Sequence, residues 1–189
     1  MGSSLCSLGG VGLAHHFQTR NPEPDRERRA PDDTETPSIS WPNYHSGRNG
    51  DFQTITVVEP RHELLRSPDS PSGRIEFLPA HPHEGAVAAP PGDASARVIA
   101  KGRSQMTGRE FNLVVAFDRS VDGRSNHLGR AVAESSFHHF ADYNWDPTLG
   151  CPPFVTEPVG DALGKNPRAA ADVRRYVRNL ALWLAPEQR

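Results

Sequence analysis

The clearest hydrophobic pattern lies near the C-terminal end of the chain. Within residues 166–185, apolar side chains recur at three- and four-residue spacing, and charged side chains lie mostly on the opposite side. This periodicity predicts an amphipathic α-helix. Asn166 suits the N-cap, Pro167 suits the first helical position, and Pro186 ends the predicted helix.

Short runs of β-branched and alternating apolar residues predict a set of strands, at residues 52–58, 74–78, 97–100, 110–117 and 130–135. The loop at residues 102–109 suggests that the third and fourth of these strands form a hairpin. Residues 113–117 are apolar without interruption, which is typical of a strand that is covered on both faces.

The remaining chain is polar and rich in turn residues. Residues 18–50 are predicted to form a long polar loop, because charges alternate and prolines recur in its first part. The length of 189 residues suits one domain spanning residues 1–189. The two cysteines, Cys6 and Cys151, make no disulfide framework.

Charge and hydropathy exclude several classes of protein. The formal net charge of −2 produces no global positive field, so neither nucleic acid nor an anionic membrane is an expected partner. No apolar run approaches the roughly 18 residues of a membrane span. No basic residue precedes the mildly apolar start, as it would in a secretory signal. We therefore predict a cytoplasmic location, and we expect no bound cofactor.

Histidines are unevenly distributed, and seven of the nine fall in four small groups. Imidazole transfers protons near neutral pH and binds metal ions, so these groups are candidate sites. In the HPHEG sequence, His81 and His83 would point the same way if the chain is extended. The pair indicates either a polar loop or a site for zinc or another imidazole-binding metal. Glu84 could serve as a general base.

A second cluster, FHHFAD at residues 137–142, follows the last predicted strand and continues into a Tyr-Asn-Trp-Asp run. Either His138 or His139 could face a site, and Asp142 could orient an imidazole as a hydrogen-bond acceptor. The aromatic and amide side chains suit a sugar ring. They equally suit an ordinary loop that is anchored by a tryptophan.

A third candidate lies near the N-terminus. Residues 9–16 have the glycine-rich pattern of a strand, a tight turn and a helix start, which is the geometry of a nucleophile elbow. Gly12 stands where such an elbow would present Ser or Cys. His15 lies at the predicted helix start, and Tyr44 and His45 lie in a loop rich in Gly and Asn.

These segments resemble a known family. Residues 11–16 resemble the elbow of class I glutamine amidotransferases, with Gly12 in place of the catalytic Cys, and are more similar to the elbow of the trehalose-utilisation (ThuA-like) family. Residues 54–62, 75–84 and 128–138 resemble segments of that family in the same order. The combination of GGVGLAHHF, SWPNYHSGRNGDFQ, HPHEG and SSFHHF is similar to uncharacterised bacterial relatives of this group.

The resemblance implies a partial flavodoxin-like α/β fold with a mostly parallel sheet and long polar loops. It also implies that the N-terminal βα units of the family are missing. One face of the sheet would then be uncovered and could mediate self-association. No glutaminase activity is expected, because Gly12 offers no thiolate to form an acyl-enzyme.

The predicted function is binding of a small polar ligand, with a carbohydrate derivative as one candidate, in a cleft lined by histidines. The candidate catalytic residues are His83, Glu84 and His138, and the candidate ligand-binding residues are His15, Tyr44, His45, His81, His139 and Asp142. The HPHEG and FHHF segments are expected to lie close together. Two alternatives stay open: a non-enzymatic remnant or interaction module, and a metal-dependent hydrolase that uses His81 and His83.

Overall fold

The computed structural model describes residues 46–82, 84, 87, 89, 92–105, 108, 110–118, 129–140, 142–151, 153 and 158–185. The predicted elbow and most of the predicted polar loop lie outside these residues. The same holds for four candidate site residues, His15, Tyr44, His45 and His83.

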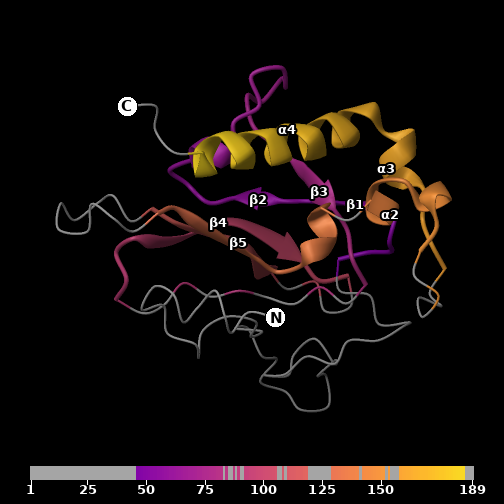
Figure 1. Cartoon of the computed structure of the whole chain (residues 1–189), viewed down its shortest axis with the longest axis horizontal. Helices are drawn as coiled ribbons and strands as arrows, with labels where there is room; N and C mark the ends of the chain where they lie inside the picture. The colour runs from indigo at the N-terminus through magenta and orange to yellow at the C-terminus, as the bar shows by residue number, and fades with distance from the viewer. Residues whose placement is uncertain are drawn as a thin grey trace, which may run out of the picture.

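Two antiparallel sheets form the centre of the described chain (Figure 1). The larger sheet has the strand order β2-β4-β5-β6, with β2 at Thr56–Val57, β4 at Ala96–Arg103, β5 at Glu110–Phe117 and β6 at Ala131–Glu134. The smaller sheet pairs β1, Phe52–Thr54, with β3, Phe77–Pro79. In the described chain, every pair of neighbouring strands in the two sheets is antiparallel.

The prediction of a mostly parallel, flavodoxin-like sheet is therefore wrong. Residues 113–117 are all buried, as the apolar run indicated, but they belong to an antiparallel strand between β4 and β6. Leu113 and Val114 join a core that includes Tyr176 of the C-terminal helix. Val115 packs with Val87 in a second cluster. A continuous apolar run indicates that both faces of a strand are covered, but it does not indicate whether the neighbouring strands are parallel or antiparallel.

The β4–β5 hairpin is present where the sequence predicts it. Ala96 pairs with Phe117 at one end, and Arg103 pairs with Glu110 at the other. The register shifts on either side of Ala100, which is the irregularity expected of a β-bulge. Such a bulge increases the local twist and bends the strand.

Helical elements are mostly short, except at the C-terminal end. Those within the described residues are η4 (Glu63–Leu65), η5 (Phe137–Phe140), α2 (Asp142–Trp145), η6 (Pro147–Leu149), α3 (Ala162–Lys165) and α4 (Pro167–Leu184). Asn166 caps α4, because its side-chain oxygen accepts hydrogen bonds from the backbone N–H groups of Arg168 and Ala169. Figure 1 shows α4 running along one side of the strands, next to β2 in this view. Among the described residues, no helix has the length and apolar character that crossing a membrane requires.

The main core lies between α4 and the sheets. It includes Leu64 and Leu65 of η4, Ile99 of β4, and Tyr176 and Trp183 of α4. A separate cluster places Leu163 of α3 against the first turns of α4. The two clusters fix α4 against the strands along its length, and this arrangement brings the Tyr176 hydroxyl to the end of β6.

Candidate functional site

Glu84 is the centre of a polar network inside the fold. Its carboxylate follows β3 and has no exposed surface. One oxygen, Oε2, accepts hydrogen bonds from the Ser46 hydroxyl and from Gln53 Nε2, the latter at 2.7 Å. The other oxygen, Oε1, lies 2.7 Å from Ser135 Oγ and 2.8 Å from His139 Nε2. Four donors therefore surround a carboxylate that water does not reach.

His139 lies between two carboxylates. Its Nε2 faces Glu84, and its Nδ1 lies 2.9 Å from Glu134 Oε2 at the end of β6. A carboxylate accepts and does not donate, so both ring nitrogens carry protons and the ring is an imidazolium. The other oxygen of Glu134 accepts a hydrogen bond from the Tyr176 hydroxyl. We call this set, with Ser46, Gln53 and Ser135, the Glu84–His139 network.

The protonation states of the network follow from these contacts. Burial by itself would raise the pKa of Glu84, but the hydrogen bond and charge of His139, with the Ser46 and Ser135 hydroxyls, lower it to about 2. Burial would lower the pKa of His139, but its contacts with Glu134 and Glu84 raise it to about 10. The pair is therefore a charged carboxylate and a charged imidazolium near neutral pH.

Tyr176 completes the network from the side of α4. Burial raises the pKa of its phenol well above the ordinary value, and the negative charge of Glu134 raises it further. The tyrosine therefore stays neutral and acts as a hydrogen-bond donor. On the other side, Trp145 Nε1 donates to the backbone carbonyl of His139 at 2.8 Å. The network thus joins the chain after β3 to β6, η5, α2 and α4.

His138 occupies a different environment from its neighbour in sequence. It is half-buried, whereas His139 is 1% exposed. Its ring stacks on the ring of His81, with centroids 3.6 Å apart and an interplanar angle of 14°. The ring of Phe137 lies 4.0 Å away on the same 3-10 helix, and this phenylalanine is 65% exposed.

Two polar groups hold the imidazole of His138. Its Nδ1 lies 2.9 Å from Asn144 Oδ1 and 2.8 Å from the Tyr143 hydroxyl. The amide nitrogen of Asn144 donates to Asn49 Oδ1 at 2.8 Å and to the Ala80 carbonyl at 3.5 Å. Because the amide nitrogen is directed to those acceptors, the amide oxygen faces His138. This orientation favours the tautomer in which Nδ1 carries the proton.

The structure brings together four of the candidate residues, His81, Glu84, His138 and His139. The expectation that the HPHEG and FHHF segments lie close together is confirmed for these four. The segments were expected to meet at the carboxyl ends of parallel strands, but the described strands are antiparallel. Instead, the chain after β3 runs beside the end of β6. Asp142 begins α2, and its side chain lies outside the described part of the structure.

Several residues of the network escaped the sequence analysis, namely Ser46, Gln53, Glu134, Ser135 and Tyr176. Tyr176 falls within the predicted C-terminal helix, and its ring packs in the main core as an apolar residue of that helix would. Glu134 and Ser135 are consecutive polar residues at the end of a predicted strand. This change from apolar to polar residues could have indicated a polar site at that end. Ser46 and Gln53 carry no comparable pattern, since their role depends on a partner far along the chain.

The buried Glu84–His139 network and the more exposed group formed by Phe137, His138 and Tyr143 differ in the chemistry that they can perform. Glu84, with a pKa of about 2 and no exposed surface, is a poor proton acceptor near neutral pH, so its geometry suits a supporting role. Phe137 is exposed, and His138 and Tyr143 are half-buried, so these three side chains can reach a ligand at the surface. No group of three or more His, Cys, Asp or Glu side chains within the described residues is arranged to hold a metal ion. The metal-hydrolase alternative depends on His83 and stays a prediction.

Searches of protein-family models, of curated proteins and of solved structures gave no match to this chain. The resemblance to the trehalose-utilisation family accordingly stays a prediction from the sequence. The residues of the site itself are the basis for assigning a function.

Proposed function

We propose that this protein binds a small polar ligand rich in hydroxyl groups, such as a carbohydrate derivative, at the surface formed by Phe137, His138 and Tyr143. One observation carries the proposal. A half-buried imidazole is held in place by Tyr143 and Asn144, directly beside an exposed phenylalanine ring. An aromatic face next to fixed hydrogen-bonding groups matches the apolar face and the hydroxyl rim of a sugar ring.

The rigidity of the underlying layer supports this proposal. Binding groups are effective when their positions are set by packing and hydrogen bonds behind them. His139 is anchored on both ring nitrogens, and it immediately follows His138 in η5. Asn144 is completely buried and immediately follows Tyr143 in α2. His138 and Tyr143 are therefore each adjacent in sequence to a residue that is held in the interior.

Such a site would bind its ligand by hydrogen bonding, and its imidazole could also transfer a proton. Imidazole and phenol groups both donate and accept hydrogen bonds, and imidazole exchanges protons near neutral pH. The proposal requires binding and does not require turnover. The absence of glutaminase activity and the cytoplasmic location stay predictions from the sequence.

Titration of the 189-residue chain with a panel of monosaccharides, disaccharides and sugar acids tests the proposal, with binding followed by calorimetry. We expect Phe137→Ala to weaken binding by about tenfold, as for the loss of one aromatic contact worth about 1 kcal/mol or slightly more. Tyr143→Phe, which removes only the hydroxyl, should also weaken it.

Leu182→Ala is the control for the Phe137 variant. Leu182 is 64% exposed on α4, which matches the exposure of Phe137, and it belongs to a different surface. Its replacement should leave the affinity unchanged. The proposal is overturned if no compound of the panel binds, or if Phe137→Ala and Leu182→Ala change the affinity equally.

A further inference from the structure

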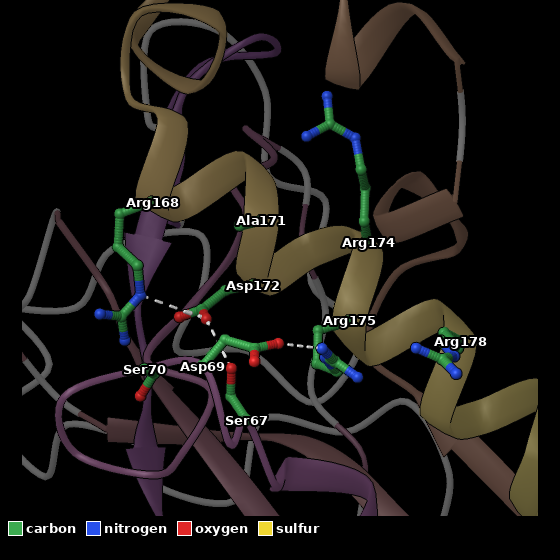
Figure 2. Close-up of a pocket in the computed structure, with 9 residues that line it drawn as sticks. All are labelled: Ser67, Asp69, Ser70, Arg168, Ala171, Asp172, Arg174, Arg175 and Arg178. Carbon is green, nitrogen blue, oxygen red and sulfur yellow. Dashed lines mark hydrogen bonds and ion pairs between the residues drawn. The ribbon is translucent and has the colours of Figure 1, made fainter.

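A cavity of about 320 Å³ lies between α4 and the loop at residues 67–70 (Figure 2). Four arginines of α4 and two aspartates contribute to its walls. Small-molecule sites are typically about 300–1,000 Å³ in volume, so the cavity is large enough for a small ligand or for one group of a larger one. It involves none of the residues of the site described above.

On the inner wall of this cavity, the charged side chains are paired with one another. Asp172 is 1% exposed, and its carboxylate accepts hydrogen bonds from Arg168 Nε at 3.3 Å and from the Glu76 backbone N–H at 2.8 Å. Ser67 Oγ lies 3.5 Å from the same carboxylate. Arg168 also pairs with Glu76 Oε2 at 2.8 Å. These groups satisfy one another and hold the loop against α4.

The outer part of the cavity carries excess positive charge. Arg175 and Arg178 are three residues apart on one side of the helix, and so are neighbours on its surface. Arg175 forms an ion pair with Asp69, whose side chain is 77% exposed. Arg178 has no ion pair or hydrogen bond to another described residue. Figure 2 shows Arg174 pointing away from Asp69, so Arg175 and Arg178 are the arginines best placed to act together.

Asp69 occupies the position that an anionic ligand would take. Exposed ion pairs contribute only about 0–1 kcal/mol, so a ligand that contacts both guanidinium groups can displace the aspartate at little cost. A phosphate group suits this position because its oxygens can accept paired N–H donors from more than one guanidinium.

We propose that this cavity binds the phosphate group of a small phosphorylated molecule, with Arg175 and Arg178 as the contacts and Asp69 as an internal competitor. The modest volume and the net charge of −2 for the whole chain favour a small molecule over a nucleic acid, which needs an extended positive surface. This site is independent of the proposed function, since it shares no residue with it.

Binding of inorganic phosphate and pyrophosphate to the 189-residue chain, followed by phosphorus NMR and calorimetry, tests the proposal. We expect both to bind, and pyrophosphate to bind more tightly. Arg178→Gln should weaken binding by about tenfold, the loss expected for one charge-assisted hydrogen bond. Asp69→Asn should instead strengthen binding, because it removes the competing carboxylate while keeping the shape of the side chain.

Two control variants separate a local site from a general effect of net charge. Asp161→Asn removes a carboxylate that is 68% exposed and pairs with Lys165, as Asp69 pairs with Arg175. Arg103→Gln removes an arginine that is 64% exposed in β4. Both controls should leave the affinity unchanged, and thermal melts should show that every variant is folded.

The proposal is overturned if neither anion binds at millimolar concentration, or if each control shifts the affinity as much as its partner variant. Tighter binding of a single-stranded oligonucleotide than of pyrophosphate would also overturn it, in favour of a nucleic-acid surface.

Discussion

The carboxylate of Glu84 and the imidazole of His139 lie 2.8 Å apart although 55 residues separate them in the sequence, and neither side chain has any exposed surface. Taking two charges out of water is costly, and only good geometry with further hydrogen bonds offsets that cost. Here both ring nitrogens and both carboxylate oxygens have partners. The pair therefore holds the end of β6 against the chain that follows β3.

Replacing Glu84 by Gln should destabilise the fold strongly. Breaking a buried ion pair typically costs about 3–5 kcal/mol, because the remaining partner keeps an uncompensated charge. The free energy of unfolding in urea measures this cost. Glu110→Gln is the control, since Glu110 pairs at the surface with Lys101 and Arg103 and should cost about 0–1 kcal/mol. Equal losses for the two variants would contradict a buried charged pair.

The stability of the protein should fall at both ends of the pH range. The pKa of Glu84 is about 2 in the folded state, below its ordinary value of 4.5, so its contribution is present above about pH 4.5 and is lost as the pH falls towards 2. The pKa of His139 is about 10, above its ordinary value of 6.5, so its contribution is complete below pH 6.5 and is lost as the pH rises through 10.

Tyr176 should steepen the alkaline loss, because its raised pKa means that the folded state resists ionisation of the phenol while the unfolded state does not. Urea unfolding at a series of pH values measures the profile. Glu84→Gln should flatten its acid side. An unchanged acid side in that variant would show that other carboxylates are responsible.

Asn144→Ala should affect both stability and ligand binding. Asn144 is completely buried, and its amide nitrogen donates to Asn49 Oδ1 and to the Ala80 carbonyl, so its loss removes the donor to these acceptors, at about 1–3 kcal/mol each. Without its amide oxygen, the imidazole also loses a contact that orients it. Thermal unfolding and ligand titration report the two effects separately.

Asn179→Ala provides a comparison for that variant. Asn179 also donates its amide hydrogens to the chain, at the carbonyls of Leu64 and Arg66, but it lies on α4 away from His138. Its replacement should lower stability without changing affinity for a ligand of the Phe137–Tyr143 surface. A ligand affinity that is unchanged in both variants would remove the orienting role of Asn144.

Gly50→Ala should destabilise the fold far more than Gly150→Ala. Both glycines have left-handed backbone conformations, with φ of 88° and 86°, in which a side chain costs about 1–2 kcal/mol. A Cβ at Gly150 would meet nothing within 4 Å, whereas one at Gly50 would lie 2.3 Å from the Gly160 carbonyl oxygen. That contact forces apart the loop holding Asn49 and the segment before α3. Similar melting temperatures for the two variants would contradict this close packing.

Elements that depend on contacts between near neighbours could be predicted from the sequence. The C-terminal helix was predictable because its apolar stripe, its Asn166 cap and Pro167 all act within a few residues. The β4–β5 hairpin was predictable for the same reason, since its strands are joined by a short loop. The grouping of histidines also indicated where polar chemistry gathers, because residue type limits what a side chain can do.

How these elements pair, and which polar groups contact one another, could not be predicted without the tertiary structure. Strand direction depends on how the chain connects in space, and a buried run such as residues 113–117 is apolar in either direction. Of two adjacent histidines, the turn of η5 directs His139 inward to two carboxylates and leaves His138 half-buried beside Phe137. Contacts with Glu84, Glu134 and their partners stabilise the inward orientation of His139. These contacts form only when distant segments of the chain pack together.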